Sequence, residues 1–131
     1  MRYHGPDFDM HDAWFLNVDG VVHAFHLRNY HPGTCHMEWP IGHLVSRDLL
    51  HFEPLPDILP PLMDPDNPKD FGGKFTGCCF TNPKDGTHFV YYTMRDNVRT
   101  SQRFGACTSK DMEHFTMCPE NPVLEPDSSL M

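Results

Sequence analysis

Histidines and cysteines are the residues of this chain that could bind a metal ion or act as nucleophiles, since ten His and five Cys occur among 131 residues. His23 and His26 lie three positions apart in a predicted strand, so their side chains point to opposite faces and cannot share one ion. His31, Cys35 and His36 lie together in a predicted loop and could contribute to a zinc site, but their spacing matches no closed tetrahedral set. We therefore expect no bound metal and no other cofactor.

The cysteines match neither a zinc motif nor a disulfide framework, and their count is odd. Cys78 and Cys79 are adjacent, whereas Cys35, Cys107 and Cys118 are scattered along the chain. This distribution is typical of reduced, mostly buried cysteines in a cytoplasmic protein.

Composition indicates a globular protein, with 39% hydrophobic and 21% charged residues. The formal net charge of −8 repels phosphate backbones, so we expect no nucleic-acid partner. No apolar run is long enough to span a membrane, and the polar segment Met1–Asp9 does not resemble a secretory signal, which favours a cytoplasmic location. Thirteen Pro and nine Gly imply many turns and favour an all-β fold.

An internal repeat defines the elements that must position any functional residues. Residues 42–52 read GHLVSRDLLHF and residues 105–115 read GACTSKDMEHF. The two segments share Gly, Ser, a basic residue, Asp, His and Phe. A second match lies upstream, where Asp19-Gly20 and Asp85-Gly86 each precede an apolar run. Two matches in the same order at nearly the same offset indicate a duplicated structural unit.

Each unit is predicted to contain four antiparallel strands. The first strands cover about 12–17 and 75–81, and an Asp-Gly hairpin turn follows each of them. The second strands cover about 21–28 and 87–94, the third about 41–46 and 103–108, and a short fourth strand completes each unit. A repeated four-stranded meander is a β-propeller blade. We predict an all-β chain with two blades, blade one about 10–62 and blade two about 72–125.

The repeated Ser-basic-Asp segment has a local physical role. Its Ser can cap a tight turn and its Asp can accept backbone N–H bonds within that turn. The Phe that follows is expected to pack between neighbouring blades. These residues are Ser46, Asp48 and Phe52 in the first unit, and Ser109, Asp111 and Phe115 in the second.

The chain resembles the five-bladed propeller glycoside hydrolases of family 32 (invertase and levanase type) and family 43 (arabinanase type). The stretch Trp39-Pro-Ile-Gly-His-Leu-Val-Ser-Arg-Asp-Leu-Leu-His-Phe is similar to the family 32 pattern Trp-Gly-His-x-x-Ser-x-Asp-Leu-x-His-Trp. Phe75-Thr-Gly-Cys-Cys-Phe resembles the Phe-Ser-Gly-Ser signature of the second blade. The resemblance implies the first two blades of an incomplete five-bladed propeller.

In such enzymes an Asp on the first strand of blade one points into the central funnel, and the resemblance places Asp12 there. It would act as the nucleophile of a retaining enzyme or as the general base of an inverting one. The sequence His-Asp-Ala-Trp-Phe replaces the usual Asn-Asp-Pro-Asn-Gly, which indicates a divergent branch. Because the acid Glu and a second Asp come from later blades, we expect this chain to hold only part of the catalytic set.

Several other residues are candidates for binding sugar. Aromatic rings can stack on sugar faces, although packing between blades is an equal alternative for the two tryptophans. Asp7 and Asp9 compete with Asp12 but are expected to precede the strand. The predicted substrate-binding residues are Trp14, Trp39, Phe75 and Asp96.

The predicted function is therefore that of a glycoside hydrolase-like protein of the furanosidase type, with a carbohydrate as its partner. The alternatives are a non-catalytic carbohydrate-binding or scaffold module, or a truncated gene product without independent activity. Two blades leave blade faces uncovered, which suggests self-association through residues such as Phe25, Leu27, Phe89 and Tyr91, or through their alternating neighbours.

Overall fold

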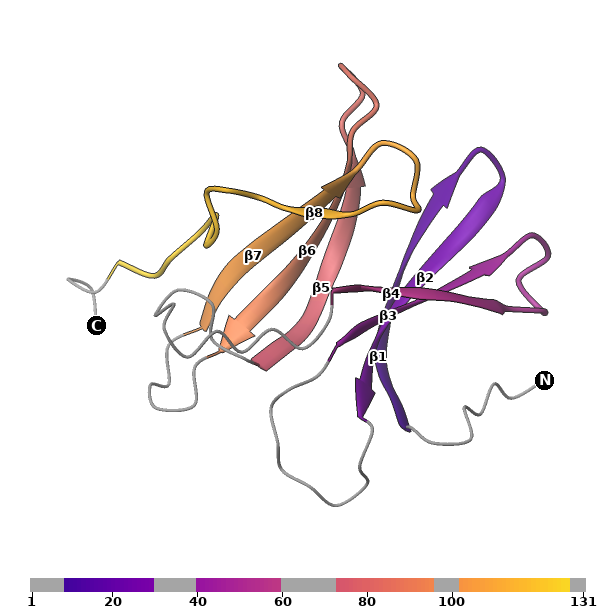
Figure 1. Ribbon diagram of the computed structural model, residues 1–131, viewed down its shortest axis with the longest axis horizontal. Helices are drawn as coiled ribbons and strands as arrows, with labels where there is room; N and C mark the ends of the chain where they lie inside the picture. The colour runs from indigo at the N-terminus through magenta and orange to yellow at the C-terminus, as the bar shows by residue number, and fades with distance from the viewer. Residues whose placement is uncertain (1–8, 30–39, 60–72, 96–101, 128–131) are drawn as a thin grey trace.

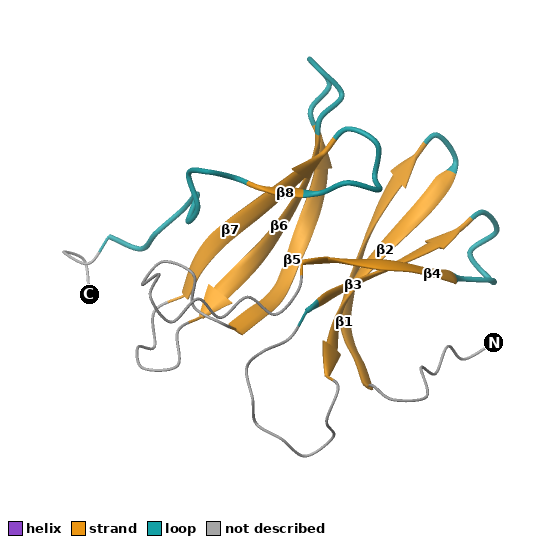
Figure 2. Cartoon of the chain, in the orientation of Figure 1, coloured by secondary structure: helices purple, strands orange, loops and turns teal. Residues whose placement is uncertain are grey.

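The computed structural model describes residues 9–29, 40–59, 73–95 and 102–127, which form two antiparallel sheets of four strands each. The sheets lie side by side, and in each the strand order follows the chain, as a simple meander does (Figure 1). The described ranges contain no helix, and hence none that could span a membrane (Figure 2). Blade one comprises β1 (Asp9–Val18), β2 (Val21–Asn29), β3 (Ile41–Ser46) and β4 (Glu53–Leu59), and blade two comprises β5 (Gly73–Thr81), β6 (His88–Arg95), β7 (Gln102–Ser109) and β8 (Thr116–Met117). The predicted all-β fold of two four-stranded meanders is confirmed.

The first strand is longer than predicted. β1 begins at Asp9, which pairs with Asn29 at the end of β2. The prediction that Asp9 precedes the strand is therefore wrong, because β2 extends far enough to provide a ladder partner for it. Asp7 lies outside the described residues.

Both Asp-Gly pairs occur in hairpin turns, as predicted, but the two turns differ. Asp19 and Gly20 both have positive φ values, 51° and 82°, which suit the two-residue turn that connects β1 directly to β2. Gly86 instead closes a longer loop, in which its N–H donates to the carbonyl of Asn82 at 2.8 Å.

The glycine shared by the two units makes room for a side chain on the neighbouring strand. A Cβ atom at Gly42 would lie 2.5 Å from the ring of His26, and one at Gly105 would lie 2.7 Å from the ring of Tyr92. His26 and Tyr92 are the direct ladder partners of these glycines. In each blade, a glycine is therefore needed on the third strand because the ring of its partner on the second strand lies over it.

The hydrophobic core lies between the blades, where β1 and β2 face β5. Phe25 and Leu27 are 0% and 1% exposed, so of the two predicted alternatives for the uncovered face of blade one, the one that names these residues is excluded. These two β2 side chains point towards blade two, and their alternating neighbours point away from it. Phe89 and Tyr91 remain partly exposed on the far side of blade two. The cluster of buried core residues comprises Trp14, Phe25, Leu27, Ile41, Ile58, Leu59, Val90, Tyr92, Met94, Cys107 and Met112.

Candidate active site

Asp12 lies at a β-bulge in β1, where the pairing with β2 shifts between His11 and Ala13. Its backbone φ is 20°, a value that residues other than glycine rarely adopt. A bulge turns its extra residue out of the ladder, and bulges are common beside functional sites. The Asp12 side chain is exposed, on the edge strand of blade one that faces blade two.

Blade two supplies a partner for this carboxylate from an equivalent bulge. The pairing of β5 with β6 shifts between Phe75 and Gly77. Thr76 lies at that shift, and its hydroxyl donates a hydrogen bond of 2.5 Å to Asp12 Oδ2. Thr93 Oγ1 in turn donates to the carbonyl of Thr76 at 3.0 Å. The orientation of the Asp12 carboxylate is therefore set by blade two.

Sequence reasoning does not identify Thr76 as the partner of Asp12, although the Phe75-Thr-Gly motif contains it. The feature of the sequence that could have identified this contact is the threonine hydroxyl at the centre of the motif, which can donate a hydrogen bond to a carboxylate. Gly77 keeps the bulge tight, since a Cβ atom there would lie 1.7 Å from the carbonyl oxygen of Tyr91. A side chain at Gly77 would force β5 away from β6.

Trp14 follows the bulge but packs in the core. Its side chain is 7% exposed, its ring centroid lies 6.4 Å from that of Phe25, and its indole lies beside the thiol of Cys79. The thiol contact is weak, because Trp14 Nε1 has no hydrogen-bond partner within the described residues. This burial agrees with the packing alternative for Trp14 rather than with stacking on a sugar.

The remaining predicted sugar-binding residues are only partly described. Phe75 is partly exposed, and it directly precedes Thr76, the residue that donates a hydrogen bond to Asp12. Its contact with a sugar remains a prediction. Among the described residues no group of three side chains is arranged to hold a metal ion. The candidates that lie outside the described residues are Trp39 and Asp96 for sugar, and His31, Cys35 and His36 for zinc.

A pair of histidines fills the interface next to the core. His23 Nδ1 lies 2.8 Å from His43 Nε2, and the ring of Phe115 meets His43 edge-on at 5.8 Å. Burial lowers the pKa of both histidines, helped by the nearby His88 for His23, and brings the pKa of His43 to about 4. The pair is therefore neutral at pH 7 and packs as aromatic rings. His26 lies on the opposite face of β2, as predicted.

The cysteines only partly match the prediction. Cys78, Cys79, Cys107 and Cys118 are all free thiols. Burial raises the pKa of Cys79 and of Cys107 to about 12, so neither is a ready nucleophile. Cys78 is exposed, contrary to the expectation of mostly buried thiols, because adjacent residues of β5 point to opposite faces. Cys35 lies outside the described residues.

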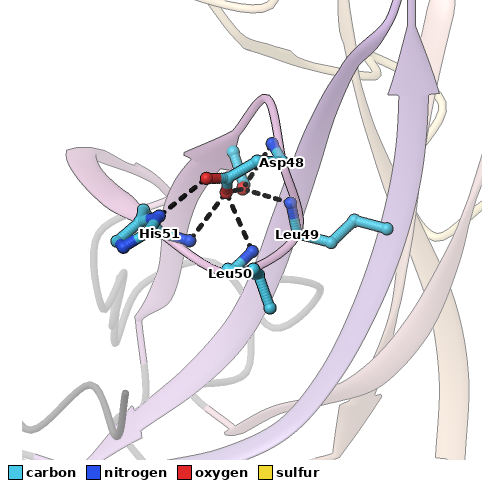
Figure 3. A network of polar contacts seen from close by, with 5 residues as sticks. Asp48, Leu49, Leu50 and His51 are labelled. Atoms are coloured by element: carbon cyan, nitrogen blue, oxygen red, sulfur yellow. Dashed lines mark hydrogen bonds and ion pairs between the residues drawn. The ribbon is translucent and has the colours of Figure 1, made fainter.

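The repeated turns are capped as predicted. Ser46 Oγ accepts the N–H of Leu49 at 2.9 Å, and Asp48 Oδ1 accepts the N–H of His51 at 2.8 Å (Figure 3). The His51 side chain, together with the backbone N–H groups, holds the pKa of Asp48 well below its usual range. The same hydrogen bonds recur in residues 109–114. These repeated residues are structural.

The two four-stranded meanders lie side by side, and a hydrogen bond between the bulges of their first strands, from Thr76 to Asp12, connects them. This arrangement is that of two neighbouring blades of a β-propeller. Residues 13–130 match the glycosyl hydrolases family 32 N-terminal domain, and the chain belongs to this family. It is one of the two families that the sequence motifs resemble. No curated protein matches the chain significantly.

Solved structures show the same fold over most of the chain. Fructan 1-exohydrolase IIa from Cichorium intybus has a TM-score of 0.76 and 22% identity, over 95% of this chain and 23% of its own. A β-fructofuranosidase from Schwanniomyces occidentalis has a TM-score of 0.75 and 18% identity, over 94% and 26%. An exo-inulinase from Aspergillus awamori has a TM-score of 0.73 and 21% identity, over 98% and 29%. The chain spans about a quarter of the length of these structures.

Proposed function

We propose that this chain carries the catalytic carboxylate of a furanosidase that hydrolyses O-glycosidic bonds in fructose- or arabinose-containing saccharides. One observation carries the proposal: Asp12 is exposed on a bulge of the first strand and is oriented by the hydroxyl of Thr76. Structures of similar fold support the substrate class, since they include a β-fructofuranosidase with fructosyl-erythritol and a fructan exohydrolase with 1-kestose.

The chemistry requires two carboxyl groups, one on each side of the scissile bond. In a retaining reaction Asp12 attacks the anomeric carbon, and the leaving oxygen takes a proton from the second carboxyl group. In an inverting reaction Asp12 takes a proton from the attacking water. The Thr76 hydrogen bond to Oδ2 leaves Oδ1 as the oxygen available for either step. The family resemblance implies that the second carboxyl group comes from a later blade.

A glycosyl fluoride tests the role of Asp12 without the acid, because fluoride leaves without protonation. The 131-residue protein is incubated with fructofuranosyl fluoride and with arabinofuranosyl fluoride. If Asp12 is the nucleophile, its carboxylate forms a bond to the anomeric carbon as the C–F bond breaks, and intact-protein mass spectrometry detects a sugar adduct. Peptide mapping should place the adduct on Asp12.

Two variants control this experiment. D12N should form no adduct, while D19N changes another exposed Asp of blade one and should behave as the wild type. Release of fluoride without an adduct, abolished by D12N alone, would assign Asp12 as a general base. Sugar binding without either reaction would instead favour the non-catalytic carbohydrate-binding alternative and overturn the proposal.

A further inference from the structure

A second hydroxyl group holds the bulge of β5 from which Thr76 reaches Asp12. Thr93 lies on β6 directly opposite Phe75, in the last ladder pair before the register shift. Its Oγ1 donates a hydrogen bond of 3.0 Å to the carbonyl oxygen of Thr76. A bulge leaves its extra residue unpaired in the ladder, and backbone polar groups need a partner. Thr93 therefore gives the Thr76 carbonyl a bond that the ladder does not provide.

The peptide group between Thr76 and Gly77 is also held from a second side. Gly77 packs so closely against β6 that a Cβ atom there would lie 1.7 Å from the carbonyl oxygen of Tyr91. The carbonyl of Thr76 and the N–H of Gly77 belong to one planar unit. Because Thr93 binds this unit at its carbonyl and Tyr91 packs against its glycine, the direction in which the Thr76 side chain leaves the backbone is fixed.

The Thr76 side chain depends on this backbone support because it is exposed. An exposed threonine can change between staggered rotamers, so its hydroxyl has no fixed position of its own. The hydroxyl nevertheless reaches Asp12 Oδ2 in the other blade at 2.5 Å. Hydrogen bonds weaken steeply when their distance or angle is disturbed. A small rotation of the β5 bulge would therefore separate the Thr76 hydroxyl from the carboxylate.

Blade one has a different residue at the position of Thr93. The bulge of β1 lies between His11 and Ala13, and the ladder partner of His11 is Leu27. Leu27 has no hydroxyl, and it is 1% exposed in the core between the blades. A bulge of this type therefore forms without a hydroxyl on the neighbouring strand. The hydroxyl of Thr93 belongs to the bulge that carries the hydrogen-bond donor for Asp12, which favours a role in the site over a role in the fold.

We propose that Thr93 is a positioning residue of the candidate active site. It holds the carbonyl of Thr76 so that the Thr76 hydroxyl stays on Asp12 Oδ2, and it thereby keeps Oδ1 as the oxygen available for the reaction. A water molecule could satisfy the same carbonyl, but water is not attached to β6 and would not fix the bulge. The inference rests on the proposed catalytic role of Asp12, whereas the orientation of the carboxylate can be measured without any reaction.

NMR of the Asp12 carboxyl carbon is the first experiment. T76V removes the donor itself, so its effect on the chemical shift of Asp12 Cγ defines complete loss of the hydrogen bond. T93V keeps the shape of the side chain but lacks the hydroxyl, and it should move the Asp12 resonance in the same direction. T93S retains the hydroxyl and should restore the wild-type shift. T93A also lacks the hydroxyl and replaces T93V in the test if T93V does not fold.

The reaction with the glycosyl fluoride measures the consequence for the chemistry. T93V should lower the maximal rate of adduct formation or fluoride release by about tenfold, since misplacing a reacting group by about 1 Å can cost more than that. The concentration of glycosyl fluoride that gives half of the maximal rate should not change, because Thr93 acts on Asp12 and not on the sugar. T93S should react as the wild type does.

T81V is the matched control. Thr81 lies at the other end of the same ladder, where its Oγ1 is 2.9 Å from His88 Nδ1. The variant removes a threonine hydroxyl from the same pair of strands but away from the bulge. It should leave both the Asp12 resonance and the reaction rate unchanged. Circular dichroism of each variant shows whether its sheets are intact.

Several results would overturn the proposal. One is a T93V variant that leaves the Asp12 resonance or the reaction rate at the wild-type value. Others are equal shifts in T93V and T81V, no recovery in T93S, or an Asp12 resonance that T76V itself does not move. The expected shifts without any adduct or fluoride release would contradict only the proposed function, and Thr93 would still be the residue that orients the Asp12 carboxylate through Thr76.

Discussion

Blade one and blade two share a strand order, a capped turn and a first-strand bulge, but they differ in the side chains that those features present. Asp12 lies at the bulge of blade one and Thr76 at that of blade two. The buried pair of His23 and His43 also has no counterpart, since Phe89 takes the equivalent position to His23 in blade two. The repeat therefore retains residues that the backbone requires, while the positions around them are free to acquire different chemistry.

The largest loss of stability is expected at Gly77, because the bulge of blade two has no room for a Cβ atom there, whereas the bulge of blade one has an alanine at the equivalent position. G77A should destabilise the protein by about 3 kcal/mol, because its Cβ overlaps a backbone carbonyl oxygen that cannot easily move. Urea unfolding measures this loss. In blade one, Ala13 occupies the equivalent position and already carries a Cβ atom.

The reverse substitution is the control for this prediction. A13G should cost only about 1 kcal/mol, which is the usual effect of glycine within a strand. Similar losses for G77A and A13G would mean that the two bulges are equally tight. G77A should also weaken the contact between Thr76 and Asp12, which the adduct yield with the glycosyl fluoride would report.

A smaller effect is expected from the buried histidine pair, which only blade one contains, and it should appear as a pH dependence of the free energy of unfolding. The pKa of His43 is lowered to about 4 in the folded protein. Between pH 6.5 and pH 4 the unfolded chain therefore binds a proton that the folded chain excludes, and stability falls as the pH falls. We expect a loss of about 2 kcal/mol between pH 7 and pH 5. Urea unfolding at the two pH values measures it.

H43Q should reduce this dependence, because glutamine keeps a hydrogen-bonding group but does not titrate. His23 and His88 lie in the same interface, and the lowered pKa of His23 adds a contribution of the same sign. The lowered pKa values of Asp48 and Asp111 act in another window, below about pH 4, where those carboxylates take up protons. An unchanged pH dependence in H43Q would exclude His43 as its source.

Residues with a local backbone role are the ones that the sequence predicts well. The Asp-Gly turns and the Ser46 and Ser109 caps follow from rules that act within a few residues. The contact of Asp12 with Thr76 joins residues far apart in the chain, and no local pattern specifies it. The burial of Trp14 is similarly set by the neighbouring blade.

The smallest predicted effect concerns the two capping serines, whose local geometry is the same but whose surroundings differ. S46A and S109A each remove a hydroxyl that accepts a backbone N–H, from Leu49 at 2.9 Å and from Met112 at 2.8 Å. Water can replace the lost acceptor at Leu49, which is exposed, so S46A should cost about 0.5–1 kcal/mol.

Met112 is 3% exposed in the core between the blades, where water has poor access to its N–H. S109A should therefore leave a buried donor unsatisfied and cost about 1–2 kcal/mol. Urea unfolding of both alanine variants, with S46T and S109T as controls that keep the hydroxyl, measures the difference. Equal losses would show that the turn alone, and not its burial by the neighbouring blade, determines the strength of the cap. A larger loss for S109A would show that blade one contributes to the stability of a turn in blade two.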